Sequence, residues 1–323
     1  MARYETRPFA ADSLDDAAQL RAADHRRHRI AMPALNPDFE DVEAVRAEIA
    51  TLLAHDRSSG VLVLAAGKPV AYVIGAPRPD PRWGANVFVD DAGFGGEDAE
   101  AIREGYAAAA RLWVEAGFAN QSVLVNSADT TQVEAWFSLS FGKQHIHALR
   151  ERASPDYVPE RRDGLSIRLK EKRDLPALAE LGRVVPAHVR TSPTFSSITV
   201  PSYEDALAEA EEDLENTAYT EWVAEHDGRV VATAVACSLE LSQMTTKLMR
   251  PRSAGFLAHA AVVPEGRGLG AGRALGQVII AWSRDQGYEW TASDWRSANL
   301  EANRTWRSLG FTPSFYRLHR LIG

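Results

Sequence analysis

The chain has one cysteine, no long apolar run and no excess of basic residues, and each absence excludes a class of protein. A single cysteine, Cys237, leaves no disulfide framework and no cysteine cluster for a metal. No uninterrupted apolar run approaches the ~20 residues that span a bilayer, and the first residues lack the apolar core of a secretory signal. A net charge of −8 argues against a nucleic-acid partner, because binding phosphates needs a basic face. We therefore expect a cytoplasmic protein without a membrane, nucleic-acid or metal partner.

What is present suits two globular domains that repeat one another. The 323 residues are 45% hydrophobic and 25% charged, and a domain takes about 150 residues. When the sequence is aligned with itself at an offset of 170 residues, residues 127–129 (Ser-Ala-Asp) match residues 297–299 (Ser-Ala-Asn) and Trp136 matches Trp306. An offset of 161 aligns residues 67–71 with 228–232, so the second copy carries nine extra residues near 240–253. The chain therefore reads as one duplicated unit.

The pattern of each copy predicts strand, two helices, a hairpin, a longer strand, helix, strand, helix and closing strands. We expect an α+β fold in which each domain is a mostly antiparallel twisted sheet flanked by helices. The predicted domains are residues 1–152 and 165–323, joined by a linker at 153–164 that contains two prolines. In the second copy the predicted elements are 165–169, 174–185, 203–214, 219–225, 230–239, 254–263, 272–286, 290–294, 300–309 and 313–321.

A glycine-rich loop follows an apolar strand and opens an amphipathic helix in the second copy. Residues 267–272 read Arg-Gly-Leu-Gly-Ala-Gly. Glycine lets the chain approach an oxyanion closely, and the N–H groups at a helix N-terminus point at it with the helix dipole behind them, so the loop predicts a phosphate site. The glycine order does not fit a dinucleotide fingerprint, and no Lys-Ser or Lys-Thr follows as in a P-loop.

From Val262 onward the sequence resembles the acyl-CoA pyrophosphate loop of the GNAT superfamily of acyltransferases, whose pattern is Val-x-Pro-x-x-Arg-Gly-x-Gly-x-Gly. A second signature of that family matches Asn299, Ala302, Trp306, Gly310 and Phe311. The two matches stand in the right order, about thirty residues apart. The resemblance implies two tandem GNAT-like domains and acetyl-CoA, or another acyl-CoA, as co-substrate.

The resemblance also implies which residues bind the cofactor, and in the second copy they are intact. They are Val262, Val263, Arg267, Gly268, Leu269, Gly270, Ala271, Gly272, Asn299, Asn303 and Trp306. In the first copy residues 97–102 (Glu-Asp-Ala-Glu-Ala-Ile) stand at the loop, so carboxylates replace the glycines and repel a pyrophosphate. We expect residues 1–152 to be a degenerate GNAT-like domain without the acyl-CoA loop, either shaping the substrate cleft or serving as structural support.

The catalytic residues are less well defined. The resemblance implies that the backbone N–H of Ala260 donates a hydrogen bond to the thioester carbonyl and that Asp294 is the general base. Asp294 equally suits a structural role as a partner of Arg296. His259 is the rival base, but strand alternation puts 256, 258 and 260 on one face and turns His259 away. The usual tyrosine acid is replaced by Trp306, so either water or Tyr316 protonates the thiolate.

We therefore expect an acetyl-CoA-dependent N-acyltransferase that acts on the amine of a small molecule by direct attack. The alternatives are a non-catalytic acyl-CoA-binding sensor and a protein N-terminal acetyltransferase. A degenerate first copy followed by an intact second copy is similar to the layout of the mycothiol synthases. The position of their catalytic base holds Phe256 here, so their substrate is not assigned to this chain. The acceptor pocket is expected near residues 190–201, and Lys247, Arg250 and Arg252 are either solvated or bind an anionic group. The sequence leaves the oligomeric state open.

Overall fold

The duplicated sequence folds into two units that exchange pieces of chain. The computed structural model describes residues 3–78 and 84–323. The first unit comprises Met1–Ile146, Thr246–Arg252 and Ser314–Gly323, and the second comprises His147–Thr245 and Ser253–Pro313. The predicted division at residues 153–164 follows the sequence repeat and remains a prediction, whereas these units follow the packing.

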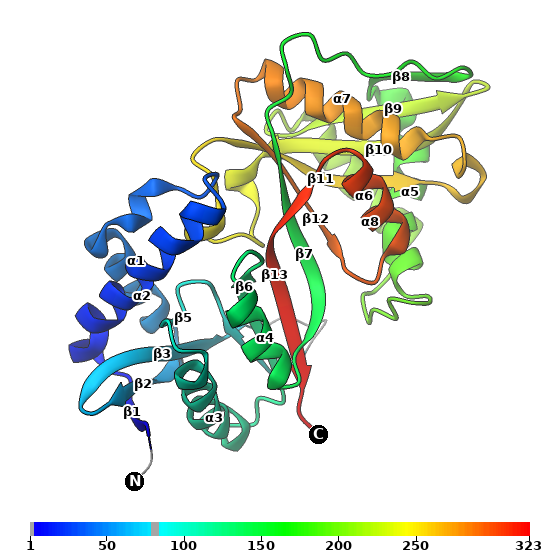
Figure 1. The fold of residues 1–323 in the computed structure, drawn as a ribbon. Helices are drawn as coiled ribbons and strands as arrows, with labels where there is room; N and C mark the ends of the chain where they lie inside the picture. Colours follow the sequence, from blue (N-terminus) through cyan, green and yellow to red (C-terminus); the bar gives the residue numbers. More distant parts are fainter. Residues whose placement is uncertain (1–2, 79–83) are drawn as a thin grey trace. The chain divides into compact units, whose positions relative to one another are not determined.

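The first unit is a sheet with helices on both faces (Figure 1). Its strands run in the order β1-β2-β3-β4-β6-β13, with β5 beside β3, and all pair antiparallel except β4 with β6. The elements up to the linker are β1 (Glu5–Pro8), α1 (Leu14–Ala31), α2 (Val42–Leu53), β2 (Ser59–Ala65), β3 (Lys68–Pro77), β4 (Asn86–Val89), β5 (Phe94–Gly95), α3 (Ala99–Glu115), β6 (Asn120–Asn126), α4 (Thr130–Ser138) and β7 (Gly142–Glu151).

Strand alternation divides the first unit's core into two layers. Val61 and Val63 of β2 pack on the side of α3 and α4, whereas Leu62 between them packs with α1 and α2. Both layers bury aromatic side chains, Trp113 and Trp136 in the first and Tyr72 in the second. The period of two in the sequence therefore places each apolar residue on a defined face.

Segments from the second half of the sequence complete this core. In β13 (Thr312–Leu321), residues 315–321 pair with β6, and Leu318 is fully buried in the layer beside α3. Leu248 lies in the layer of α1 and α2, and Met249 packs with Phe88 and Phe315. The first copy therefore depends on the second for part of its hydrophobic core.

The second unit repeats the plan with β12-β11-β10-β9-β8, antiparallel except for β11 with β12. Helix α7 lies on one face, and α5 and α6 lie on the other (Figure 1). The elements are β8 (Leu165–Leu169), α5 (Leu175–Val189), α6 (Tyr203–Glu212), β9 (Thr220–His226), β10 (Arg229–Ser238), β11 (Ala254–Val262), α7 (Ala271–Asp285), β12 (Trp290–Arg296) and α8 (Leu300–Ser308). The expected α+β class and each predicted element of this copy are confirmed, with ends that shift by a few residues.

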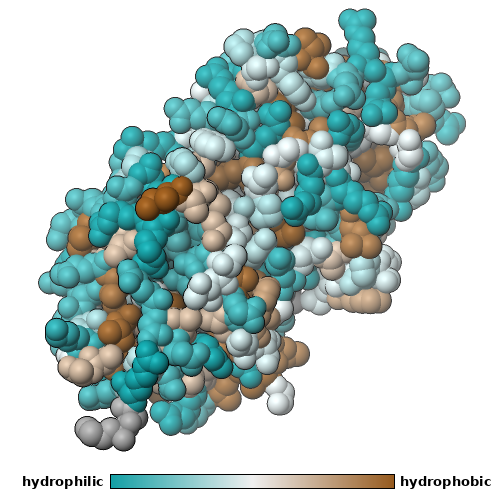
Figure 2. All heavy atoms as spheres, in the orientation of Figure 1, coloured by the Kyte–Doolittle hydropathy of each residue, from teal (hydrophilic) through white to brown (hydrophobic). Residues whose placement is uncertain are grey.

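The face of the molecule in Figure 2 is mostly hydrophilic, with apolar side chains scattered over it. Large exposed apolar residues include Ile30, Val158 and Phe195. Among the described helices, none combines the length and the apolar character that crossing a bilayer requires.

We predict that Leu318→Ala destabilises the first unit, although residue 318 belongs to the second copy by sequence. Leu318 is fully buried in the core of that unit, so truncation leaves a cavity and lowers the free energy of unfolding by about 3 kcal/mol. Leu321→Ala in the same strand is the control, because Leu321 is 66% exposed. Hydrogen exchange resolved by peptide measures the effect, and faster exchange confined to residues 165–313 would contradict the assignment of this strand to the first unit's core.

Candidate functional site

The site is built where two neighbouring strands separate. Strands β11 and β12 pair in parallel only as far as Leu257 and Ser293, whose hydroxyl donates to the Leu257 carbonyl at 3.4 Å. Beyond that point β11 continues to Val262 with β10 alone on one side. Because successive backbone N–H groups of a strand point to opposite edges, alternate groups of residues 258–262 face the gap that β12 leaves. This edge can bind an extended ligand through its backbone.

A β-bulge interrupts β11 at the same place. Val235 pairs with His259 and Ala236 with Leu257, so Ala258 has no counterpart on β10. The strict alternation expected from the sequence over residues 256–260 is therefore wrong. His259 lies on the face that α5 covers, with Ala261, while Ala260 and Val262 lie on the other face.

The N-terminus of α7, which a glycine caps, lies at this gap. Gly270 caps the helix with φ 79°, a left-handed conformation that suits glycine. Gly272 lies in the first turn, where a Cβ would meet Val262 at 3.4 Å. The first N–H groups of α7 have no partners within the helix and carry the positive end of its dipole, so this end of the gap favours an anion.

A cavity of about 380 Å³ lies in the gap, and most of the predicted cofactor residues line it. Those residues are Val262, Arg267, Gly268, Gly270, Ala271, Gly272, Asn299 and Trp306, and Ala260, predicted as a catalytic contact, lines the cavity as well. Trp306 is held there because Gly276 of α7 leaves room for its ring, where a Cβ would lie 2.9 Å from it. The structure thus brings the two separate sequence signatures to one cavity.

Three of the predicted residues do not line this cavity. Val263 packs beside the core of the second unit, and its N–H donates to the Val231 carbonyl at 2.9 Å. Leu269 is absent from the lining. Asn303 also lies outside it, and its side-chain oxygen accepts from the Trp295 indole at 3.3 Å.

The cavity also has walls that the sequence did not indicate. Val184, Val185 and His188 come from the end of α5, and Glu301 and Thr305 from α8. The residues of α8 carry a signal, because they follow Asn299 at helical spacing. The residues of α5 carry none, since only the tertiary fold brings that helix to the strand.

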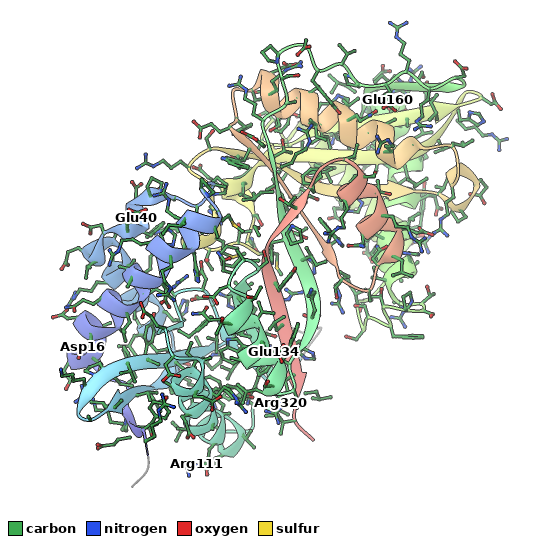
Figure 3. The ribbon with its side chains drawn as sticks, viewed as in Figure 1. Asp16, Glu40, Arg111, Glu134, Glu160 and Arg320 are labelled. Atoms are coloured by element: carbon green, nitrogen blue, oxygen red, sulfur yellow. The ribbon has the colours of Figure 1, made fainter. Side chains whose placement is uncertain are left out.

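The predicted linker supplies a further residue, Arg162, directly over the glycine loop. A Cβ on Gly270 would lie 2.9 Å from the guanidinium carbon of Arg162, so only glycine allows this contact. The segment is held along α7, because the Glu160 N–H donates to Gln277 at 3.3 Å and the Arg284 guanidinium donates to the Tyr157 carbonyl at 2.6 Å. Figure 3 labels Glu160 beside this helix. Arg267 and Arg162 both bring positive charge to this end of the cavity, where the Glu160 carboxylate lies 3.8 Å from the Arg162 guanidinium.

A second cavity, of about 500 Å³, lies under α5 and α6 in the same unit. Lys170, Glu221 and His259 line it, together with Ala258 at the bulge. The Lys170 ammonium lies 3.0 Å from the Glu221 carboxylate, which also accepts from the Thr233 hydroxyl at 2.7 Å. Burial lowers the pKa of His259, and the Glu221 charge opposes this only in part, so His259 is neutral near pH 7.

The predicted catalytic residues are divided among different places. Ala260 lines the first cavity and His259 the second. Asp294 is half-buried in β12 and lines neither of them. Tyr316 belongs to the first unit, where the Lys143 ammonium lies 3.7 Å from the centre of its ring.

The first unit closes the position that corresponds to the glycine loop. Asp98 caps α3, and its carboxylate accepts from the Glu100 N–H at 3.0 Å and from Tyr4. Arg3 pairs with the same carboxylate at 3.1 Å. A side chain of the protein therefore takes the place at this helix N-terminus that an anionic ligand would need.

The structure bears on two further expectations from the sequence. Lys247 and Arg252 have exposed side chains, as expected of solvated residues, and they pair with Glu48 at 2.8 Å and with Asp38 in the first unit. The loop of residues 190–201, expected to build the acceptor pocket, lines neither cavity.

The comparisons with known proteins agree with this geometry. Residues 189–311 match the model of the Acetyltransferase (GNAT) family. The human protein N-acetyltransferase 8B is 33% identical over 90 residues, which cover 28% of this chain and 37% of that protein.

Two solved structures show the same fold across both units. One is a GCN5-related N-acetyltransferase from Sphaerobacter thermophilus, with a TM-score of 0.58, 16% identity and coverage of 99% of this chain and 96% of that one. The other is a tandem GNAT protein from the clavulanic acid biosynthesis pathway, with a TM-score of 0.50, 16% identity and coverage of 98% and 97%. The tandem GNAT-like fold expected from the sequence is thereby confirmed.

We predict that Arg162→Ala weakens the binding of acetyl-CoA about tenfold, the scale of one lost contact to a charged group. The adjacent Arg161→Ala, also exposed in the linker, should leave the affinity unchanged. Calorimetry with acetyl-CoA and with S-acetyl-pantetheine, which lacks the diphosphate, separates a phosphate contact from a general disturbance. An equal loss for both ligands would contradict the phosphate contact.

Proposed function

We propose that this chain, a GNAT protein over residues 189–311, is an acetyl-CoA-dependent N-acyltransferase that acts on the amine of a small molecule. The observation that carries the proposal is the first cavity, where the edge of β11, the N-terminus of α7 and Trp306 of α8 converge. A backbone edge suits the amide groups of a pantetheine arm, and the cationic helix end suits a diphosphate.

The cofactor supplies the activated acyl group, and the protein's own residues orient it. Arg267 and Arg162 bind the diphosphate at the helix end, and the backbone of Ala260 donates to the thioester carbonyl. A preorganised N–H donor at that oxygen stabilises the negative charge that develops as the amine attacks. Trp306 packs against the cofactor near its sulfur.

The transfer needs no covalent enzyme intermediate. An ammonium group first gives a proton to a base, and the freed nitrogen lone pair forms the N–C bond at the thioester carbon. The C–S bond then breaks with its electron pair on sulfur, and the second proton of the nitrogen ends on the thiolate through solvent. The products are the amide, CoA thiol and one proton.

The turnover experiment combines calorimetry with a thiol assay. We expect acetyl-CoA to bind once per chain, because the corresponding helix of the first unit is capped by Asp98. We also expect an amine panel to release free thiol. Binding without thiol release across the panel would favour a non-catalytic acyl-CoA sensor, and two equal sites would contradict the degenerate first domain.

We predict that Gly270→Glu abolishes acetyl-CoA binding. The change adds a carboxylate where a diphosphate binds, strains a residue with φ 79° and collides with Arg162. Gly287→Glu is the control, because Gly287 follows the other end of α7 with φ 84° and open space around it. Equal losses of affinity in both variants would show that backbone strain alone is responsible.

Two residues compete for the role of base, and the lining of the second cavity favours His259 over Asp294. His259 is neutral near pH 7 and can accept a proton there, whereas Asp294 lies outside both cavities. The residue predicted from the family resemblance, Asp294, remains the alternative. The titratable groups that line the second cavity with His259 are Lys170, which follows β8, Glu221 of β9, Glu209 of α6, and Asp213 and Tyr219 between α6 and β9.

We predict that His259→Gln lowers kcat/KM about 10²-fold, in the range of losing a general base, while Asp294→Asn retains the rate. In the wild type kcat/KM should fall as the pH drops through the lowered pKa of His259, because the imidazole is then protonated. The glutamine variant should lose this acidic limb. A large loss in Asp294→Asn with the limb kept in His259→Gln would assign the base to Asp294.

A further inference from the structure

The second cavity adjoins the first along two elements of the second unit. On β11, Ala258 and His259 line the second cavity and residues 260–262 line the first. On α5, Leu178 and Gly182 line the second cavity, and Val184, Val185 and His188 line the first. A group bound in one cavity is therefore a few residues along the same strand from a group bound in the other.

The charged lining of the second cavity is unbalanced. Glu221 is neutralised by Lys170 at 3.0 Å, and the same ammonium donates to the Asp213 backbone carbonyl at 2.8 Å. Within the described part of the chain, the side chains of Glu209 and Asp213 form no ion pair. With His259 neutral, the cavity carries two uncompensated carboxylates. The field in it therefore favours a cation.

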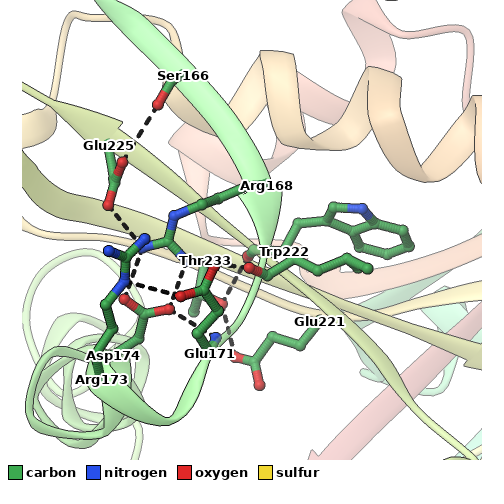
Figure 4. A network of polar contacts seen from close by, with 10 residues as sticks. Ser166, Arg168, Glu171, Arg173, Asp174, Glu221, Trp222, Glu225 and Thr233 are labelled. Atoms are coloured by element: carbon green, nitrogen blue, oxygen red, sulfur yellow. Dashed lines mark hydrogen bonds and ion pairs between the residues drawn. The ribbon is translucent and has the colours of Figure 1, made fainter.

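Glu221 belongs to a polar network that extends beyond the cavity (Figure 4). The hydroxyl of Thr233, on the neighbouring strand, donates to the Glu221 carboxylate at 2.7 Å. Close by, Arg168 makes a bidentate pair with Asp174 at 2.7 and 2.8 Å and a bond to Glu225 at 2.6 Å. The Lys170 ammonium is bound by the Glu221 carboxylate and by the Asp213 backbone carbonyl, and these two bonds hold its charge at Glu221.

The two carboxylates and His259 come from different elements around the cavity. Glu209 is exposed near the end of α6 and Asp213 is half-buried just after it, whereas His259 is half-buried on β11. An acceptor that reaches its reacting amine toward β11 therefore leaves its distal end beside carboxylates. A neutral distal end gains nothing from them, and an anionic one is repelled.

We propose that the second cavity is the acceptor site and that it selects a small amine with a second, distal positive charge, as in a diamine or polyamine. Glu209 and Asp213 attract the distal ammonium while the reacting nitrogen faces β11. This inference rests on the proposed acyltransferase function, because it assigns the acceptor of the same reaction.

Three four-carbon amines test the charge preference directly. Putrescine carries a distal ammonium, butylamine a distal methyl group and 4-aminobutyrate a distal carboxylate. With the protein saturated in CoA, calorimetry should show putrescine binding at least tenfold more tightly than butylamine, and 4-aminobutyrate binding most weakly. Equal affinities, or tighter binding of 4-aminobutyrate, would overturn the proposal.

The carboxylates are tested by the double variant Glu209→Gln with Asp213→Asn. It should remove the preference for putrescine over butylamine and leave the affinity for acetyl-CoA unchanged. Glu211→Gln is the control, because Glu211 is exposed on the same helix and does not line the cavity. A preference that survives in the double variant, or that disappears equally in the control, would overturn the role of these two residues.

The readouts separate this inference from the proposed function. Putrescine binding is measured without turnover, so it does not depend on the chemistry. Acylation of 4-aminobutyrate or butylamine in preference to putrescine would keep the acyltransferase function and refute the acceptor class. Failure of acetyl-CoA to bind would instead refute the proposed function, whatever the amines do.

Discussion

The separation of β11 from β12 after Leu257 and Ser293 is the constraint on which the site depends. Inside a folded unit, backbone groups along a strand edge must find partners, because leaving them buried and unpaired costs about 1–3 kcal/mol each. Here the chain leaves the edge open over residues 258–262 and surrounds it with α5, α7 and α8. The bulge at Ala258 turns His259 toward the second cavity while Ala260 stays on the first. One irregular strand thus serves two cavities.

The two units show opposite solutions to the same problem at a helix N-terminus. In the second unit Gly270 leaves the first N–H groups of α7 open to the cavity, and Arg162 lies over it. In the first unit Asp98 occupies the corresponding place and is itself bound by Arg3 and Tyr4. At a helix N-cap, glycine is only about a few tenths of a kcal/mol less favourable than a carboxylate. The two caps therefore differ little in stability, and they differ mainly in that the second helix leaves its first N–H groups open to a ligand.

Patterns within short segments of the sequence predicted most of the structural features that depend on local sequence. The alternation of apolar residues with a period of two predicted the strands, and the glycine-rich loop predicted the start of α7. The two signatures predicted most of the residues that line the first cavity. The features that were missed depend on contacts between residues distant in sequence. Arg162 lies over Gly270 across more than a hundred residues of sequence, and the bulge at Ala258 depends on its pairing with β10. Periodicity carries no information about such contacts, which is also why the exchange of β13 was not predicted.

The core of the first unit includes residues that belong to the second copy by sequence. The connection from β10 to β11 passes through the first unit, where Leu248 is buried and the Thr246 hydroxyl bonds Asp91. Burial and the neighbouring Asp90 raise the pKa of Asp91 to about 7, and a hydroxyl suits a carboxyl group near its pKa because it can donate or accept. The strands that this connection joins are the ones that line the second cavity. Loss of the first unit would expose the apolar side chains of residues 246–252 and of β13, and it would free both ends of the connection. The side chains that hold this connection in place are therefore among those that complete the first unit's core.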